Sequence, residues 1–257
     1  MQPFRVRTRD ADLAGLRAGS GPPLLLAHPI VFSKAFWALD VFAQRFDVAA
    51  FDQRGHGDSS GPVDFDGMAD DLGAVMDHLG WARAAIGGTS LGAATTLRFA
   101  LRRPDRVSLL VQDLPGLGPG SRRDAGRTSR MAEAFEAGDL GEAARRITEG
   151  LSAPRAQTWQ AALAADWKHY DAASLGPKLA GMLRDTVGWK VVDRWPDDLA
   201  RLSMPVRILA VQGDPTHPYE IAEAMARTIP DSKLVARVPS LTPATIAKQW
   251  IEVISEE

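Results

Sequence analysis

Short apolar runs alternate with amphipathic stretches along the first half of the chain. Runs rich in apolar residues lie at 24–27, 46–51, 83–87 and 107–111. Continuous runs of this kind are typical of strands buried on both faces. Apolar residues with helical spacing extend from Phe65 to Leu79, and a second helix is expected over 93–100. This alternation predicts an α/β fold with a mostly parallel sheet and helices on both faces.

The alternation stops between about Leu114 and Leu202. This region shows no convincing strand and carries four of the seven tryptophans, Trp159, Trp167, Trp189 and Trp195. Strand patterns return at 206–211 and 233–238, each followed by a helical pattern, at 219–228 and 242–253. We therefore predict a core made of residues 1–113 and 203–257. A helical cap, residues 114–202, is inserted after the strand that ends near Asp113.

The segment Gly88-Thr89-Ser90-Leu91-Gly92 lies between a predicted strand and a predicted helix. Glycines two positions before and after the serine allow the backbone to turn sharply. Such a turn presents the Ser90 hydroxyl above the sheet, close to the Leu91 amide and a helix N-terminus. The spacing, in this context of strand and helix, predicts a nucleophilic serine.

The composition excludes several classes of partner, catalysis and cofactor. The 257 residues contain 30 Lys and Arg against 32 Asp and Glu, so neither a nucleic-acid nor a membrane partner is expected. The chain has no cysteine, which excludes disulfides, thiolate catalysis and cysteine-ligated metals. No phosphate-binding loop or paired-histidine zinc motif is present, so no cofactor and no metal are expected. We also found no signal-peptide pattern, and we expect a cytoplasmic protein.

Three motifs in order along the chain resemble the α/β-hydrolase fold superfamily, in the form that carries a helical cap. The first is the turn Asp52-Gln53-Arg54-Gly55-His56-Gly57-Asp58-Ser59. The second is the serine turn at 88–92, which matches the nucleophile elbow of that family. The third is the lead-in from Asp197 to Val206 before the strand that carries the catalytic acid. The resemblance covers nearly the whole chain.

The resemblance implies an oxyanion hole made by two backbone amides. The family has a His-Gly pair after its first core strand, and here the pair is His28-Pro29. Ile30 therefore takes the position of one oxyanion amide, and Leu91 supplies the other. Proline fixes its own φ and favours an extended His28, so the loop is expected to be stiffer than usual. We expect His28 itself to be structural.

The resemblance also implies an acid and a base in the order serine, acid, histidine. Asp214 follows the strand at 206–211 and is the expected acid, while Asp113, at the end of the preceding strand, is the alternative. The segment after the last strand, where the family carries its histidine, contains none. Of the five histidines, none lies beyond His217. The expected triad is therefore incomplete in its usual form.

His217 is the best substitute for the missing base, because it lies three residues after Asp214 on a loop at the expected catalytic edge. His169, in the predicted cap, is an alternative. We interpret His56 as part of a loop-packing motif and His78 as a residue at a helix end, where the helix dipole favours histidine.

The sequence leaves three functions open. The first is a serine hydrolase that cleaves a small ester, thioester or lactone through an acyl-enzyme on Ser90. The second is a lyase, cyclase or cofactor-independent oxygenase on the same scaffold, and the third is a binding protein without catalysis. A base within reach of Ser90 would favour the hydrolase.

The tryptophan-rich region indicates a small, largely apolar substrate. A run of arginines at its start is interpreted as a solvated face, with steering of an anionic substrate as the alternative; it comprises Arg122, Arg123, Arg127 and Arg130. The oligomeric state is left open.

Overall fold

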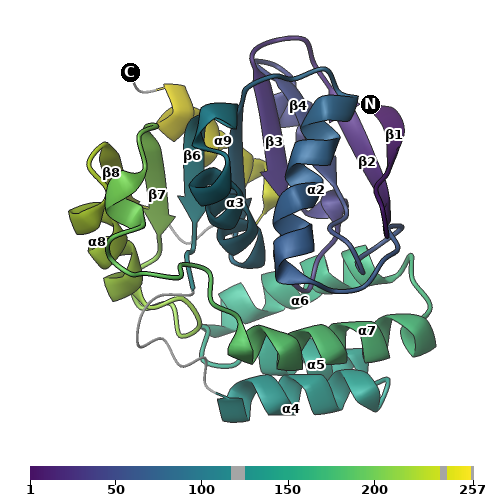
Figure 1. Cartoon of the computed structure of the whole chain (residues 1–257). Helices are drawn as coiled ribbons and strands as arrows, with labels where there is room; N and C mark the ends of the chain where they lie inside the picture. Colours follow the sequence, from purple (N-terminus) through teal and green to yellow (C-terminus); the bar gives the residue numbers. More distant parts are fainter. Residues whose placement is uncertain (117–124, 238–241, 256–257) are drawn as a thin grey trace.

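A central sheet dominates the computed structural model, which describes residues 1–116, 125–237 and 242–255 (Figure 1). Its strands are joined in the order β1-β2-β4-β3-β5-β6-β7-β8. Pairs β1–β2 and β2–β4 are antiparallel, and the other neighbouring pairs are parallel. The predicted α/β fold is thus confirmed. The strands are β1 (Gln2–Arg7), β2 (Asp12–Ala18), β3 (Pro23–Ala27), β4 (Asp47–Phe51), β5 (Ala84–Thr89), β6 (Val107–Asp113), β7 (Val206–Ala210) and β8 (Ser232–Ala236).

The hairpin of β1 and β2 was not predicted from the sequence. Within β1 only Val6 is buried, and most of the other residues are exposed. An edge strand of this kind has no continuous apolar run, which is the pattern that identifies the central strands. The predicted last strand, 233–238, is shorter in the structure, because β8 ends at Ala236. Residue 238 lies outside the described residues.

Helices cover both faces of the sheet. Successive residues of a strand point to opposite faces, and in β3 Leu24 and Leu26 join one buried cluster while Leu25 joins another. The first cluster includes residues of α1 (Leu39–Phe42) and α9 (Pro243–Ser255). The second includes residues of α2 (Phe65–His78), α3 (Leu91–Arg102) and α8 (Tyr219–Thr228).

The described residues between β6 and β7 contain four α-helices, which we call the helical layer. They are α4 (Ala125–Glu136), α5 (Leu140–Ile147), α6 (Ala153–Trp167) and α7 (Ala172–Asp185). Figure 1 shows the helical layer below the ends at which β6 and β7 point, so it faces the carboxyl ends of the parallel strands. Residues 125–202 contain no strand, as expected from the sequence. None of the described helices has the length and apolar character needed to span a membrane.

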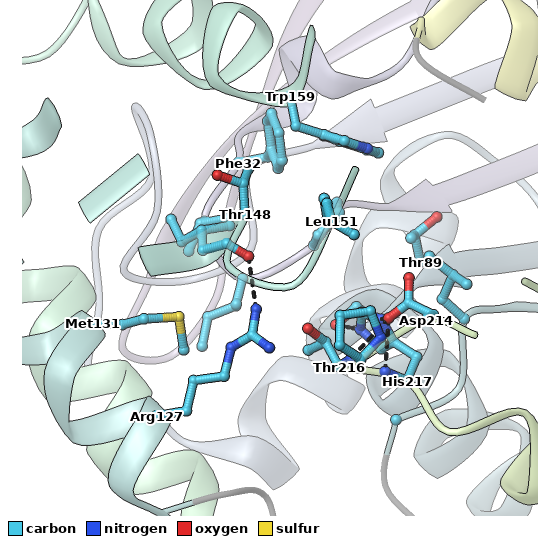
Figure 2. A pocket seen from close by; sticks show the side chains of 18 of the residues that line it. Phe32, Thr89, Arg127, Met131, Thr148, Leu151, Trp159, Asp214, Thr216 and His217 are labelled. Atoms are coloured by element: carbon cyan, nitrogen blue, oxygen red, sulfur yellow. Dashed lines mark hydrogen bonds and ion pairs between the residues drawn. The ribbon is translucent and has the colours of Figure 1, made fainter. Parts of the chain in front are cut away.

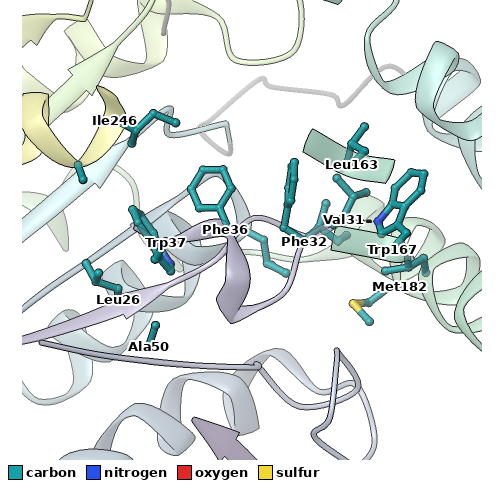
Figure 3. Close-up of a cluster of buried hydrophobic side chains, with 14 of the residues drawn as sticks. Leu26, Val31, Phe32, Phe36, Trp37, Ala50, Leu163, Trp167, Met182 and Ile246 are labelled. Carbon is teal, nitrogen blue, oxygen red and sulfur yellow. Dashed lines mark hydrogen bonds between the residues drawn. The ribbon is translucent and has the colours of Figure 1, made fainter. Parts of the chain in front are cut away.

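The loop after β3 links the sheet to the helical layer. Figure 3 shows Phe32 and Phe36 between Trp37 on the side of the sheet and Trp167 on the side of the helices. The indole Nε1–H of Trp167 donates a hydrogen bond of 2.8 Å to the carbonyl of Val31. Asp166 adds two hydrogen bonds, because its carboxylate accepts from the Ser33 amide at 3.0 Å and from the Ser33 hydroxyl at 2.6 Å. Helix α6 is therefore fastened to the segment that follows Ile30.

Candidate active site

Ser90 occupies the sharp turn between β5 and α3. Its φ of 56° and ψ of −110° lie in a region that residues other than glycine rarely adopt. The two flanking glycines are sterically required. A Cβ on Gly88 would lie 2.2 Å from the carbonyl carbon of Gly92, and one on Gly92 would lie 2.1 Å from the carbonyl oxygen of Ala27. The close contact of strand and helix forces the strained backbone that presents the serine hydroxyl.

His217 contacts Ser90 directly, although 127 residues separate the two in the sequence. Its Nε2 lies 2.9 Å from Ser90 Oγ, and its Nδ1 lies 3.1 Å from Asp214 Oδ1. An ionised carboxylate can only accept, so Nδ1 carries the ring proton and Nε2 is left to accept from the Ser90 hydroxyl. This is the tautomer that a general base beside a serine requires.

Backbone hydrogen bonds fix the Asp214 carboxylate. The amides of Thr216 and His217 both donate to Oδ1 at 2.9 Å. Burial opposes ionisation of Asp214, but the hydrogen bond from the His217 ring, the charge of that ring and the two amides outweigh it and lower the pKa of the carboxyl to about 2. The group is therefore an anion across the neutral pH range, next to the ring that would take up a proton.

Asp113, the alternative acid, is engaged elsewhere. It is fully buried, and its Oδ1 lies 3.0 Å from Nε of Arg237. Its Oδ2 accepts from the Thr89 hydroxyl at 2.9 Å and from the indole of Trp250 at 3.4 Å. The structure thus places Asp214, and not Asp113, against His217.

The two residues whose amides the sequence analysis assigned to an oxyanion hole are both found near Ser90. Ile30 lines the same cavity as Ser90, and Leu91 is the first residue of α3. Within the described residues neither amide donates a hydrogen bond to another protein group. Both N–H groups are therefore available to an oxygen atom bound next to Ser90.

Two buried histidines hold the loop that carries Ile30. His28 Nε2 accepts from the Gln53 amide at 3.0 Å, and its Nδ1–H donates to the Pro29 carbonyl at 2.8 Å. Burial, together with the nearby His56, lowers the pKa of His28 well below its usual value. His56 donates from Nε2 to the Ile30 carbonyl at 2.8 Å. Both histidines thus stabilise the loop, which agrees with the structural roles expected for them.

Residues of the 52–59 turn also form hydrogen bonds that stabilise the loop carrying Ile30. Asp52 accepts hydrogen bonds of 2.7 Å from both the amide and the ammonium group of Lys34. Arg54 forms two bonds of 2.8 Å with the buried carboxylate of Asp71, which fixes the turn against α2. The motif thus supports the site from outside the cavity.

The other histidines do not reach the site. His169 and His78 are exposed, and neither lines the cavity beside Ser90. Residues 238–241, which follow the last strand where the family's histidine is expected, lie outside the described residues. Of the five histidines, only His217 is placed to accept a proton from Ser90 in the described structure.

A cavity of about 380 Å³ opens above Ser90, under the helical layer. This volume lies in the range typical of small-molecule sites. Figure 2 shows Asp214 and His217 together, with Arg127 and Met131 of α4 across the cavity from them. The described residues contain no cluster of acidic or histidine side chains placed to hold a metal ion.

Three arginines line this cavity, namely Arg127, Arg155 and Arg237. Arg127 belongs to the basic run that the sequence analysis interpreted as a solvated face; it is half-buried, lines the cavity, and donates from Nη2 to the carbonyls of Ile147 and Glu149. Arg122 and Arg123 lie outside the described residues. No sequence motif singles out Arg155 or Arg237, which the fold brings to the site from α6 and from the end of β8.

Comparisons with known proteins support the fold and a broad class of function. RutD of Caulobacter segnis is 38% identical over 95 residues, which cover 34% of this chain and 36% of RutD. A fluoroacetate dehalogenase of a Burkholderia species is 38% identical over 120 residues, which cover 42% of this chain and 40% of that enzyme. The chain thus matches only about two fifths or less of the length of either relative.

A solved structure extends the likeness over the whole fold. The esterase RhEst1 from Rhodococcus sp. ECU1013 superposes with a TM-score of 0.80, at 22% identity, over 100% of this chain and 99% of the esterase. Identity at this level shows the fold alone. The named relatives support a hydrolase function. A family model described as the alpha/beta hydrolase fold matches residues 22–241, and the chain therefore belongs to the alpha/beta hydrolase fold family.

Proposed function

We propose that the protein is a serine hydrolase that cleaves a small ester, thioester or lactone through an acyl-enzyme on Ser90. The observation that carries this proposal is the chain of two contacts from Ser90 Oγ to His217 Nε2 at 2.9 Å and from His217 Nδ1 to Asp214 at 3.1 Å. The base thus lies within hydrogen-bonding reach of both the nucleophile and the orienting acid.

Acylation begins when Ser90 Oγ attacks the carbonyl carbon of the substrate while His217 Nε2 takes the hydroxyl proton. The amides of Ile30 and Leu91 stabilise the negative oxygen of the tetrahedral intermediate. The bond from the carbonyl carbon to the leaving oxygen or sulfur then breaks, and His217 returns its proton to the leaving group. Asp214 stabilises the imidazolium that exists between these two proton transfers.

Deacylation repeats the sequence with water. His217 removes a proton from a water molecule, whose oxygen attacks the acyl carbon. The second tetrahedral intermediate collapses, Ser90 Oγ leaves with the proton held by His217, and a carboxylic acid is released. The cavity around Ser90 has room for a small acyl group under the helical layer, and in this proposal that layer acts as the cap.

The contact between Ser90 and His217 favours a hydrolase over the other two functions. A lyase or an oxygenase that uses Ser90 only to hold its substrate has no need of a base hydrogen-bonded to that serine. A binding protein without catalysis has no need of the strained backbone at Ser90, which is costly to maintain.

Covalent labelling tests the proposal. Intact mass spectrometry after incubation with a fluorophosphonate should show one adduct on the protein and none on Ser90→Ala. His217→Ala should lose nearly all labelling, because Ser90 is then without its base. His169→Ala is the matched control, since His169 is exposed and does not line the cavity, and it should label like the parent protein. A folded protein that forms no adduct, or a His217→Ala variant that labels at the parent rate, would overturn the proposal.

A further inference from the structure

We propose that the substrate of this site carries a carboxylate in addition to its scissile carbonyl, and that the guanidinium of Arg237 binds this carboxylate. The inference rests on the proposed hydrolase function and extends it to a substrate class, the half-esters of short dicarboxylic acids and their close analogues. It replaces the expectation of a largely apolar substrate.

Arg237 is a buried cation with unused hydrogen-bond donors. Its side chain is 2% exposed, and the residue lines the cavity above Ser90. Among the described residues, neither Nε nor Nη1 has a hydrogen-bond partner. Nε does lie 3.0 Å from Asp113 Oδ1, but the geometry is that of an ion pair without an aligned hydrogen bond. A buried donor without an acceptor is destabilising, and such groups are rare in native proteins.

A carboxylate is the ligand that suits these donors. The Nη1–H and Nη2–H groups at the end of the side chain form a planar fork that matches the two oxygens of a carboxylate. Asp113 does not use this fork, because its Oδ1 faces Nε at 3.0 Å and its Oδ2 accepts from Thr89 and Trp250. An apolar acyl chain next to Arg237 would leave Nη1 unpaired, whereas a bound carboxylate would accept a hydrogen bond from it.

The charge of the cavity also favours a substrate with a carboxylate. The described lining contains three arginines and one aspartate, Asp214. Nη2 of Arg155 lies 3.9 Å from Asp214 Oδ2, so this carboxylate faces a cation in addition to the neutral ring of His217. Even when the buried Asp113 is included, the positive charges exceed the negative ones by one. A cavity of one predominant sign attracts ligands of the opposite sign.

The fold places Arg237 close enough to Ser90 for one small molecule to reach both. The Ser90 amide donates to the backbone carbonyl of Asp113 at 2.9 Å, and the side chain of Asp113 pairs with Arg237. Asp113 ends β6, the strand next to β5, and neighbouring strands lie about 4.8 Å apart. Ser90 and Arg237 also line the same cavity of about 380 Å³, so a short dicarboxylic chain is a suitable length to place its carbonyl at one and its carboxylate at the other.

Binding to a protein without turnover provides the test. In Ser90→Ala, calorimetric titration compares monomethyl glutarate with methyl pentanoate, which has a methyl group in place of the carboxylate. We expect monomethyl glutarate to bind at least tenfold more tightly, a difference of about 1.4 kcal/mol. Because this variant lacks the nucleophile, the result reports on recognition of the carboxylate and not on whether Ser90 is catalytic. The fluorophosphonate experiment reports separately on catalysis.

Variants of Arg237 complete the test. Adding Arg237→Met to Ser90→Ala should abolish the preference for monomethyl glutarate, and Arg237→Lys should retain part of it. Should Arg237→Met fail to fold because Asp113 is left unpaired, the combination with Asp113→Asn removes both charges and should show the same loss. Equal binding of the two esters in Ser90→Ala would overturn the proposal. A preference that survives both Arg237→Met variants, or that disappears in Arg155→Met alone, would also overturn it.

Discussion

Replacing Asp214 by asparagine removes one negative charge from the site with little change in shape. In the structure a single oxygen, Oδ1, accepts from the amides of Thr216 and His217 and from the His217 ring. The amide oxygen of asparagine can accept the same three hydrogen bonds. The position and tautomer of the ring are then retained, and the variant isolates the effect of the carboxylate charge on catalysis.

The size of this effect follows from the geometry. The imidazolium formed during acylation has its charge spread over the ring, about 4 Å from the carboxylate, since Nδ1 lies 3.1 Å from Oδ1. Two unit charges at about 4 Å interact by about 4 kcal/mol at an effective dielectric constant near 20. A loss of about 4 kcal/mol of transition-state stabilisation corresponds to a rate decrease of roughly a thousandfold. We therefore expect Asp214→Asn to lower kcat by about three orders of magnitude.

The assay is steady-state hydrolysis of a neutral aryl ester, with fluorophosphonate titration to count active serines. Asp171→Asn is the control, because Asp171 caps α7 on the exposed side of the helical layer and asparagine caps equally well. A decrease of less than tenfold in Asp214→Asn would refute the reasoning, since the carboxylate charge would then contribute little to stabilising the protonated ring.

Three further predictions concern stability. Gly88→Ala should lower Tm by several degrees, because the added Cβ would overlap Gly92 and overpacking typically destabilises by about 1–3 kcal/mol. Gly181→Ala is the control and should not lower Tm, because no atom lies within 4 Å of its added Cβ. Folding lowers the pKa of Asp214 from 3.8 to about 2, so the ionised carboxylate stabilises the folded protein by about 2 kcal/mol above about pH 4. This stabilisation is lost as the pH falls towards 2. The free energies of unfolding in urea of the parent protein and of Asp214→Asn should therefore converge between about pH 4 and about pH 2. Arg54→Met should destabilise by about 3–5 kcal/mol in urea unfolding, since it leaves the Asp71 carboxylate buried and unpaired, and adding Asp71→Leu should restore most of the loss.

Local patterns along the chain predicted the central strands and the serine turn. The apolar runs mark strands buried on both faces, and the two glycines around Ser90 mark a contact that leaves no room for a Cβ. These features depend on a few neighbouring residues, so they are visible in the sequence. The β1–β2 hairpin escaped prediction because its burial is mostly one-sided and weak.

The sequence analysis preferred Asp214 to Asp113 through the family resemblance, because no local signal separates the two. Asp113 ends β6 and Asp214 follows β7, and these parallel strands lie side by side, so both residues reach the same edge of the sheet. The difference is made by Arg237, which comes from the end of β8 and pairs with Asp113. The sequence analysis placed Arg237 inside a strand, and no local signal shows that its guanidinium reaches back to β6.

Hydrogen bonds join α6 to the loop after β3, so the helix that lines the cavity and the loop that carries the Ile30 amide are expected to move together. Asp166 and Trp167 belong to α6, whose Arg155 and Trp159 line the cavity, and their partners Ser33 and Val31 lie within three residues of Ile30. A displacement of α6 that widens the cavity therefore pulls on the amide that would hold the substrate oxygen. Room for a larger substrate and stabilisation of its transition state are thereby coupled. Engineering of substrate size in this scaffold should accordingly begin at α4, which lines the cavity through Met131 without holding that loop.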